Sequence, residues 1–485
     1  MQNGKNDKNY PTTIVVFGAT GDLFQNKLAP ALFDLFVKGA LPKDFRLIGF
    51  ARRPFSNESF RDLIKESLVQ KGRVLGVSAA RDFLGKIFYH QGRLDLAEDY
   101  QKLGKFLSDA DRKLTVCTNK LFYLAVPPDL YETIFDNLAT SGLATPCAPG
   151  FDNERLVWTR ILVEKPFGHN LATAKRLDQK LGKLFKEEQI FRIDHYLAKE
   201  TIQNILSFRF SNSLFEPIWN AKQIESIEIK FHEKNLVSER GKFYDGVGAL
   251  RDVGQNHMLQ MLAVVAMENP KKLDANLIRQ ARAKLLKAVV SGGKRTKDYA
   301  IKGQYEGYLQ ENGVGPDSKT ETFFRLKLLV KNRRWRGVPF YLEGGKALDS
   351  GKAEIVVYFK RPIDCLMSQD SKGVCEQNVL TFRIQPDEGI EVIFWAKKPG
   401  LDLALEAKSL SFKYREDNLV SKIPDAYERV LIDAIRGDQT LFASTQEVLA
   451  EWNLINPILE GWQTDSIYEY PKGSRGIDIG RIKNN

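Results

Sequence analysis

The chain has 485 residues, which is long enough for two or three domains with a large core. Hydrophobic residues make up 43% and charged residues 27% of it, as in ordinary globular proteins. The net charge of +11 invites a nucleic-acid partner, but the 72 lysines and arginines are interleaved with 61 acids and form no dense basic block. The charge therefore favours small anionic ligands, and we expect no nucleic acid among the partners.

The cysteines and the apolar runs bound the compartment. The four cysteines are far apart and form no CxxC pair, which predicts a reducing compartment and no zinc or other metal site. The first residues are polar and resemble no secretory signal. The longest near-continuous apolar run, 258–267, contains Gln260 and is too short to span a bilayer. We expect a soluble, cytoplasmic protein without a membrane partner.

The first predicted elements are a strand, a glycine turn and a helix. Residues 12–17 are β-branched and apolar throughout, as in a buried strand. Gly18 and Gly21 follow at once, and a helical pattern continues through Leu28, Leu32 and Phe36. Glycines let the backbone approach a pyrophosphate, and a helix N-terminus favours its negative charge. The spacing is GxxG rather than GxGxxG, so the strand–turn–helix context carries this interpretation.

The next segment indicates which dinucleotide binds. Residues 45–50 predict a second strand, and it is followed by Ala51, Arg52 and Arg53. An NAD site usually has an acid there for the ribose 2′-hydroxyl, whereas guanidinium groups suit a 2′-phosphate. The pair predicts NADP, with a solvated loop as the alternative.

Further alternation of strands and helices follows. Strands are predicted at 87–90, 120–126 and 155–163, with a helix at 131–138. The last strand ends in Glu164 and Lys165, and open parallel sheets place ligand contacts at that end. Pro166 can hold a cis or tightly turned bond. Residues 1–194 thus predict an α/β Rossmann domain.

From about residue 196 the pattern changes. Helices are predicted at 199–210, 249–267 and 272–289, and strands at 226–231, 322–330, 353–359, 379–384 and 390–395. Strands separated by turns favour an antiparallel sheet with helices to one side. Residues 195–485 therefore predict an α+β domain with a large, mostly antiparallel sheet, and residues 290–320 predict an exposed loop.

Two polar stretches are candidates for chemistry. Residues 251–257, RDVGQNH, lie in an otherwise apolar helix, and buried polar groups are costly unless paired. His257 could be a satisfied core histidine, but a carboxylate such as Asp194 would make it a general base. In 192–200, RIDHYLAKE, a helix starting near His195 would place Lys199 on the same face and suit a phosphate. The alternative there is a capped helix with solvated charges.

Ordered motifs carry a family resemblance over residues 12 to 476. They include GATGDL at 18–23, GFAR at 49–52, EKPFG at 164–168, RIDHYLAKE at 192–200, RDVGQNHMLQML at 251–262, KGQY at 302–305, TETF at 320–323, RWRGVPFYL at 334–342, GKAL at 345–348 and QPDE at 385–388. In this order they resemble the glucose-6-phosphate dehydrogenase family. The resemblance implies oxidation of glucose 6-phosphate at C1 to the 1,5-lactone with hydride transfer to NADP⁺, in the pentose phosphate pathway.

The resemblance also implies roles for single residues. His257 would be the general base, with Asp194 orienting it, and Lys165 would contact both substrate and coenzyme beside a cis Pro166. Seven further residues would bind the sugar phosphate. His195, Tyr196 and Lys199 would hold the phosphate, and Glu233, Asp252, Lys346 and Gln385 would lie at or near the hydroxyls. The coenzyme would lie along Gly18, Thr20, Gly21, Asp22, Leu23, Lys27 and Arg52. The family usually forms dimers or tetramers, so we expect a homodimer or homotetramer.

Departures from the family pattern and rival functions complete the predictions. Phe24 stands where the family has a small residue, Glu343 where it tends to have arginine, and Gly351 where many members have a basic substrate contact. We therefore do not carry over the second, structural NADP of some members. The rival functions are another Rossmann sugar oxidoreductase with an EKP lysine, a non-catalytic phosphosugar- or NADP-binding regulator, and a nucleic-acid-binding protein.

Overall fold

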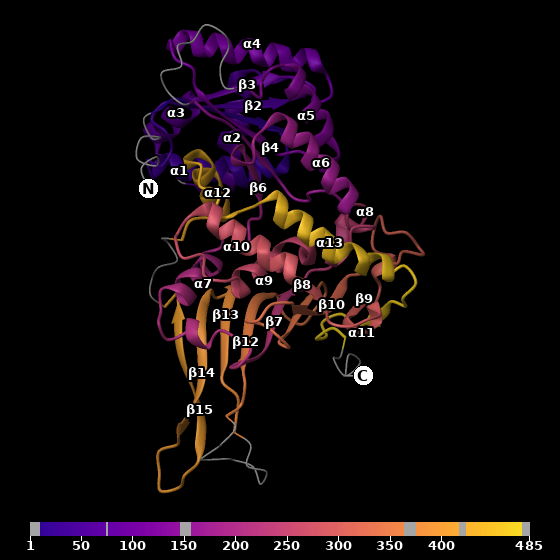
Figure 1. The fold of residues 1–485 in the computed structure, drawn as a ribbon. Helices are drawn as coiled ribbons and strands as arrows, with labels where there is room; N and C mark the ends of the chain where they lie inside the picture. The colour runs from indigo at the N-terminus through magenta and orange to yellow at the C-terminus, as the bar shows by residue number, and fades with distance from the viewer. Residues whose placement is uncertain (1–9, 74–75, 146–156, 363–374, 417–422, 478–485) are drawn as a thin grey trace. The chain divides into compact units, whose positions relative to one another are not determined.

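The computed structural model describes residues 10–73, 76–145, 157–362, 375–416 and 423–477. The chain divides into two compact units, which we describe separately (Figure 1). The first comprises residues 1–198 and 424–445, and the second comprises 199–423 and 446–485. Residues 424–445, which the sequence assigned to the second domain, pack with the first unit. The boundary at residue 194 stays a prediction.

The first unit contains a parallel sheet. Its described strands run in the order β16-β6-β5-β4-β1-β2-β3, and every pairing is parallel except that of β16 with β6. Their bounds are β1 Thr12–Phe17, β2 Phe45–Ala51, β3 Ile87–Gln91, β4 Asn119–Leu124, β5 Thr159–Val163, β6 Ile190–Ile193 and β16 Phe442–Ala443. The strands predicted in this part of the sequence are confirmed; residues 155–156 of one of them lie outside the described residues.

Helices surround this sheet. Their bounds are α1 Ala29–Val37, α2 Asn57–Gln70, α3 Val77–Gly85, α4 Ala97–Leu114, α5 Tyr131–Thr140, α6 Leu171–Leu184 and α12 Ala426–Arg436. Side chains cap several of them, as the sequence allows: Ser56 accepts from Ser59 N, and Asn170 accepts from Thr173 N. The glycine at 437 closes α12 in the left-handed conformation.

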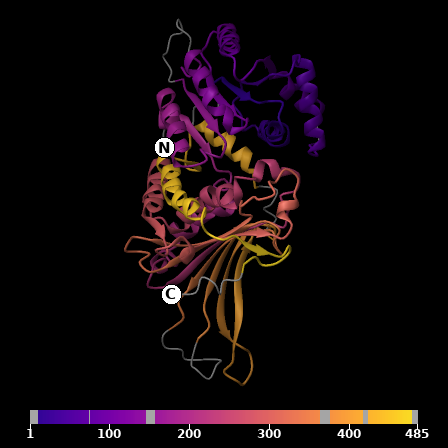
Figure 2. The ribbon, with the colours of Figure 1, turned by 90° about the vertical axis from the view of Figure 1, so that its right-hand side faces the viewer.

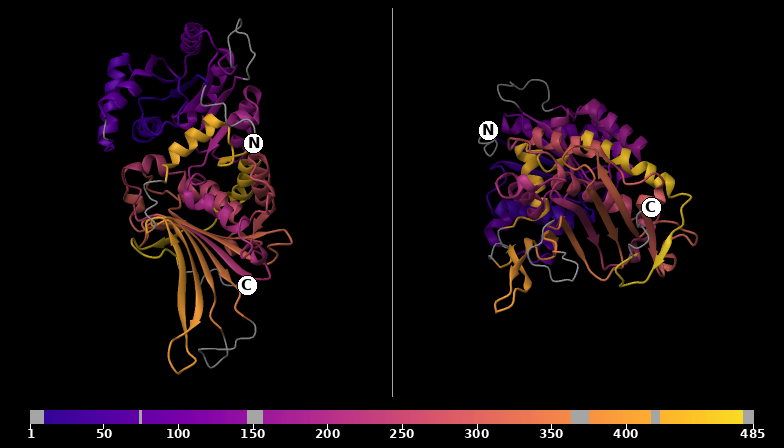
Figure 3. Two further views of the ribbon diagram at one scale, coloured as in Figure 1. Left: turned by 90° about the vertical axis from the view of Figure 1, so that its left-hand side faces the viewer. Right: turned by 60° about the horizontal axis from the view of Figure 1, so that its bottom comes forward.

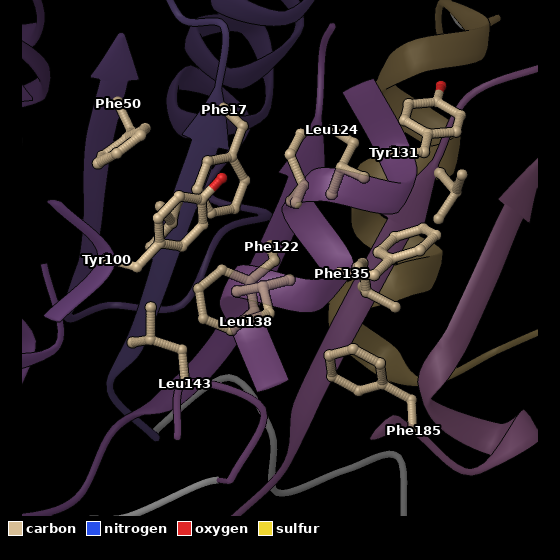
Figure 4. Close-up of a cluster of buried hydrophobic side chains, with 14 of the residues drawn as sticks. Phe17, Phe50, Tyr100, Phe122, Leu124, Tyr131, Phe135, Leu138, Leu143 and Phe185 are labelled. Atoms are coloured by element: carbon tan, nitrogen blue, oxygen red, sulfur yellow. The ribbon is translucent and has the colours of Figure 1, made fainter. Parts of the chain in front are cut away.

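The core of the first unit lies between the sheet and helices α4 and α5 (Figure 4). All six residues of β1 and of β4 are buried, as expected for central strands of a covered parallel sheet. Phe17 packs edge-on against Phe50 and stacks on Tyr100. This rigid centre fixes the ends of the strands, where the predicted ligand contacts lie.

The second unit contains a large sheet. Its strands run β15-β14-β13-β12-β7-β11-β10-β9-β17, with β8 pairing to β10, and only the β7–β11 and β9–β17 pairs are parallel among the described strands. Their bounds are β7 Ile224–His232, β8 Val289–Ser291, β9 Ala300–Tyr305, β10 Phe323–Val330, β11 Pro339–Gly345, β12 Lys352–Phe359, β13 Val379–Gln385, β14 Gly389–Lys397, β15 Leu405–Lys413 and β17 Tyr468–Tyr470. Figure 3 shows the strands side by side.

Helices gather on one face of this sheet, and the β14–β15 hairpin extends beyond them (Figures 1 and 2). Their bounds are α7 Glu200–Phe210, α8 Gly241–Tyr244, α9 Leu259–Ala266, α10 Ala275–Ala288, α11 Thr296–Tyr299 and α13 Thr445–Gly461. The predicted fold class, a Rossmann domain and an α+β domain with a mostly antiparallel sheet, is confirmed.

Some element predictions in the second unit were wrong. Residues 290–320 do not form one exposed loop, because β9 runs through them with all six residues buried. The polar residues of KGQY do not have the apolar pattern of a buried strand. Lys302 can nevertheless be buried because its ammonium donates to Trp462 O at 2.5 Å. Strands β11 and β15 were not predicted either. The helix predicted at 249–267 begins with a π-helical segment, Leu250–Met258 (η7).

Two findings bear on the compartment. Cys117 and Cys375 each take part in a disulfide bond, so the cysteines no longer support a reducing compartment. Cys147 and Cys365 lie outside the described residues. Along the part of the chain that is described, no helix is long and apolar enough to cross a membrane.

Candidate active site

The carboxyl edge of the first sheet gathers most of the predicted coenzyme residues. Parallel strands end at one edge, so the turns after β1, β2, β5 and β6 lie along it. These turns contain the glycine loop from Gly18, then Arg52, Lys165 and Asp194. Ligand contacts in open parallel sheets belong at this edge, so the first unit places these residues where a dinucleotide needs them.

Gly18 shows why the loop needs glycine. Its φ is +81°, and a Cβ there would lie 2.4 Å from Ala125 O and 2.7 Å from Val126 Cγ1. Gly21 N donates to Gly18 O at 2.9 Å and closes the turn, after which the helix begins at Asp22. A turn that is opened and closed by glycines beside a helix N-terminus lets the backbone approach a pyrophosphate.

The helix after this loop starts with a π-helical segment, Phe24–Leu28 (η2). Phe24 is fully buried and stacks on Phe60, with ring centroids 6.0 Å apart. Phe60 in turn fills the space over Gly49 of β2, where a Cβ would meet its ring at 2.4 Å. The bulky residue at 24 is therefore accommodated in the core and does not reach the loop surface, while Lys27 is exposed.

Arg52 and Arg53 are exposed directly after β2. Their main-chain carbonyls are held by side chains, since Gln91 Nε2 donates to Arg52 O at 3.1 Å and Tyr89 OH to Arg53 O at 2.5 Å. The backbone of the turn is fixed while both guanidinium groups face solvent. This arrangement fits a 2′-phosphate at the edge of the sheet.

Glu164 is a half-buried acid beside Lys165 for which the sequence predicted no role of its own. Loss of hydration is the main cause that raises its pKa to about 7; the Tyr123 hydrogen bond and the charge of Lys165 act to lower this pKa, and the charge of Asp194 acts to raise it. Tyr123 OH donates to its Oε1 at 2.5 Å, and Tyr131 OH donates to its main-chain oxygen at 2.9 Å. The Lys165–Pro166 bond is cis.

The helix predicted to start near His195 begins instead at Glu200, with Lys199 as its N-cap. Residues 195–198 form a turn because Asp194 holds it: its Oδ1 accepts from Tyr196 N and its carbonyl from Leu197 N, both at 3.0 Å. An aspartate side chain that bonds the backbone two residues on competes with helix formation. His195 and Lys199 therefore do not share a helix face.

In the second unit, three predicted substrate residues lie at one end of the sheet. β7 and β11 are parallel, and β13 runs in the same direction because both β7 and β13 are antiparallel to β12. Glu233 and Lys346 directly follow β7 and β11, and Gln385 ends β13. Lys346 Nζ donates to Glu233 Oε2 at 2.7 Å. The sheet thus brings these residues together.

Glu343, which replaces a family arginine, has its own cationic partners. It bonds His232 Nε2 at 2.8 Å through one oxygen and Arg325 through the other. Burial raises the pKa of Glu343, but these two partners lower it below its ordinary value. The negative charge is neutralised within the sheet, so the departure does not leave an uncompensated buried acid.

The π-helical segment η7 carries Asp252 and His257. Gln255, Asn256 and His257 are buried, as the sequence predicted for this polar stretch. Gln255 and Gln260 donate to the two oxygens of Glu451 at 3.4 and 2.7 Å. The neighbours of His257 are thus paired structurally. π-helical segments are rare and are frequently found at functional sites.

Tyr244 interacts both with Lys346 and with Asp252 of η7, and the sequence did not predict it. Its buried ring lies 5.4 Å from Lys346 Nζ. Burial raises its pKa well above the ordinary value, and the charges of Asp252, Glu321 and Glu233 raise it further. No sequence signal marked it, because one tyrosine in KFYDG looks like any core residue.

The predicted site residues therefore form two groups. Asp194, His195, Tyr196, Lys165 and the coenzyme loop belong to the first unit, while Lys199, Glu233, Asp252, His257, Lys346 and Gln385 belong to the second. Each group is described within its own unit. Among the described residues, no cluster of three or more His, Cys, Asp or Glu could hold a metal ion.

Both units match family models. Residues 15–204 match the glucose-6-phosphate dehydrogenase NAD binding domain, and residues 206–479 match the glucose-6-phosphate dehydrogenase C-terminal domain. A glucose-6-phosphate 1-dehydrogenase from Aggregatibacter actinomycetemcomitans is 41% identical over 476 residues, covering 96% of this chain and 93% of the relative. A cytoplasmic glucose-6-phosphate 1-dehydrogenase from Arabidopsis thaliana is 38% identical over 470 residues, covering 96% and 89%.

A solved structure agrees with these matches. A glucose-6-phosphate dehydrogenase in complex with its substrate glucose-6-phosphate superimposes with a TM-score of 0.87 at 35% identity, covering 97% of this chain and 96% of that one. Fold and site define a two-domain oxidoreductase with a dinucleotide-binding domain. The chain belongs to the glucose-6-phosphate dehydrogenase family.

Proposed function

We propose that the chain oxidises D-glucose 6-phosphate at C1 to 6-phospho-D-glucono-1,5-lactone, with hydride transfer to NADP⁺. The observation that carries this proposal is the carboxyl edge of the first sheet, with the glycine loop, Arg52, Lys165 and Asp194 along it. We infer the reaction from membership of the family, and we infer the coenzyme site from this edge of the sheet.

His257 acts as the general base. Oxidation at C1 requires a proton to leave the hydroxyl oxygen while hydride leaves the carbon, and bound NADP⁺ accepts that hydride. His257 takes the proton, and Asp194 fixes the tautomer of its ring and stabilises the imidazolium. Support comes from the position of His257 in a buried π-helical segment and from the family motif. Pairing with Asp194 is our proposal.

The remaining residues bind and orient the substrate and coenzyme. His195, Tyr196 and Lys199 hold the 6-phosphate, and Glu233, Asp252, Lys346 and Gln385 hold the sugar hydroxyls. The ion pair of Lys346 with Glu233 supports a shared hydroxyl contact, because each partner has further hydrogen-bonding capacity. Lys165 contacts both ligands. Gly18, Thr20, Gly21, Asp22, Leu23, Lys27 and Arg52 hold NADP⁺.

Assembly and compartment follow the family. We propose a homodimer or homotetramer and a cytoplasmic location, the latter supported by the Arabidopsis relative that is named cytoplasmic. The two-domain division at residue 194 is likewise proposed, with residues 1–194 binding the coenzyme and residues 195–485 binding the sugar phosphate and the partner subunit.

Initial-rate kinetics at 340 nm test this function. The enzyme should reduce NADP⁺ with glucose 6-phosphate and turn over glucose far more slowly, because the phosphate contacts are lost. Equal rates with both sugars would indicate another Rossmann sugar oxidoreductase. Ligand binding without turnover would indicate a regulator, and a salt-sensitive gel shift would support nucleic-acid binding.

A further inference from the structure

The helical segment with Asp252 and His257 has no local cap at its start. Its N-cap residue, Ala249, has no capping side chain, and the helix opens at Gly248, directly after a turn over residues 245–247. The first N–H groups of any helix lack partners inside the helix. Since this end is buried, those groups must find partners elsewhere in the fold.

Glu321, 71 positions away in sequence from Leu250, supplies them. Its side-chain Oε1 accepts from Leu250 N at 3.0 Å, and its main-chain oxygen accepts from Ala249 N at 2.9 Å. Only 5% of Glu321 is exposed. The residue precedes β10 and belongs to the TETF stretch, for which the sequence suggested no role. Two consecutive N–H groups at the start of the segment are thus fixed by one residue just before β10.

Gly248 makes room for this carboxylate. A Cβ at Gly248 would lie 2.4 Å from Glu321 Oε1, and its φ of +76° is a conformation that glycine adopts without strain. The carboxylate therefore occupies the space that a side chain at 248 would take. The chain turns at Gly248 and enters the segment at the point where Glu321 holds it.

Strand β10, which follows Glu321, contacts the middle of the segment. Phe324 packs where a Cβ of Gly254 would come within 2.7 Å of its ring. Burial raises the pKa of Glu321 above its ordinary value, although the hydrogen bond from Leu250 and the charges of Arg251 and Lys302 lower it. The start of β10 thus contacts η7 at two points, one polar and one apolar.

We propose that Glu321 is a positioning residue that fixes the N-terminal end of η7 and thereby the places of Asp252 and His257. The proposal rests on the proposed function for the roles of those two side chains. It adds that their placement is set by the carboxylate of Glu321 just before β10, because a small shift of this segment moves both side chains. Misplacement by about 1 Å can cost about a hundredfold in rate.

Variants of Glu321 in the full-length enzyme test this. Glu321→Ala removes the acceptor, Glu321→Asp keeps the charge but shortens the reach by one methylene, and Glu321→Gln keeps an oxygen acceptor. Glu311→Gln is the matched control, because Glu311 is a nearby acid that accepts from Tyr305 OH at 2.9 Å. The measurements are kcat, KM for glucose 6-phosphate, KM for NADP⁺ and the melting temperature.

We expect Glu321→Ala and Glu321→Asp to lower kcat by about tenfold or more and to raise KM for glucose 6-phosphate. KM for NADP⁺ should stay within about twofold, since the coenzyme loop belongs to the other unit, and Glu321→Gln should recover most of kcat. General damage to the fold would not separate the two KM values. If Glu321→Ala does not fold, the aspartate and glutamine variants provide the same comparison.

Wild-type kcat and KM values in Glu321→Ala, or in Glu321→Asp if the alanine variant does not fold, would overturn the positioning role. So would a glutamine variant as impaired as the aspartate variant. The proposed function fails by different results, namely equal wild-type rates with glucose and glucose 6-phosphate or binding without turnover, and the base role of His257 fails by full turnover of His257→Asn. The two failures can therefore be told apart.

Discussion

Each unit has a π-helical segment beside a sequence motif. Phe24–Leu28 follows the glycine loop of the first unit, and Leu250–Met258 carries RDVGQNH in the second. In the first segment the apolar residues Phe24 and Leu28 are buried, while Asn26 and Lys27 are exposed. In the second segment the polar residues Gln255, Asn256 and His257 are buried, while Arg251 and Asp252 are half-buried.

The difference shows two ways to use the same local geometry. In the first segment the apolar residues pack into the core and the polar residues face solvent. In the second segment Gln255, Asn256 and His257 lie inside the fold, where each must be paired or must serve chemistry. Substitutions should therefore affect mainly stability in the first segment and mainly turnover in the second.

The largest expected effect is that of His257→Asn in the second segment. Asparagine has a similar size but cannot take a proton at neutral pH, so kcat should fall by roughly 10² to 10⁴. Binding of glucose 6-phosphate, measured by isothermal titration calorimetry, should be largely intact. Loss of binding along with activity would show that the residue holds the substrate rather than serving as the base.

In the first segment, Phe24→Ala should act on stability. The ring is fully buried and stacked on Phe60, and truncating such a residue typically costs about 3–5 kcal/mol. The variant should unfold at lower denaturant concentration, while kcat below its melting temperature stays near wild type. Asn26→Ala, on the exposed side of the same segment, is the control. A Phe24→Ala enzyme that is as stable as wild type but has lost turnover would contradict the expectation that substitutions in the first segment act mainly on stability.

Glu164 is a half-buried acid in the first unit, and its titration makes stability depend on pH. Its pKa of about 7 lies above the ordinary 4.5, mainly because the carboxyl group has lost hydration. The folded protein keeps this proton up to about pH 7, whereas the unfolded chain loses it near pH 4.5. Stability from this group is therefore complete below pH 4.5 and declines as the pH rises to 7.

Glu164→Gln should abolish this decline, because glutamine does not ionise. Each pH unit in the window is worth about 1.4 kcal/mol, so the variant should gain on the order of 3 kcal/mol on wild type between pH 4.5 and 8. Urea unfolding of both proteins across that range measures the difference. A constant difference would mean that Glu164 ionises normally. Tyr123, Tyr131, Tyr427, Lys165 and Asp194 surround the group and are unchanged in both proteins.

The sequence predicted β1 to β5 of the first unit because each contains a run rich in apolar residues, but it did not predict β6 and β16. It missed β9 because Lys302 and Gln304 are buried with backbone carbonyls as acceptors, and such partners are distant in sequence. The helix start at His195 was wrong for a local reason: Asp194 bonds the backbone of its own turn. Neither π-helical segment could be predicted, since a single extra residue in a turn leaves the apolar pattern nearly unchanged.

The sequence predicted the site residues that the family resemblance specifies. It could not predict residues whose role depends on the contacts they make in the fold. Lys346 was expected from the GKAL motif and Glu233 from its position in the family resemblance, and their ion pair agrees with a common location. The residue types of Glu321 and Tyr244 indicate no role, because both residues act through their contacts with other residues. Such roles depend on the pairing of β10 and on the path of the chain after Gly248, which only the fold reveals.

The smallest expected effect concerns the exposed edge of the first unit. Arg52→Ala should raise KM for NADP⁺ by about tenfold, or about 1.4 kcal/mol, and leave KM for NAD⁺ nearly unchanged, because only NADP⁺ has a 2′-phosphate. Lys43→Ala removes an equally exposed charge at the opposite end of β2 and should change neither constant. Equal losses for both coenzymes would place Arg52 at the pyrophosphate instead, and would extend the ligand-facing surface of the first unit from the glycine loop to the second strand.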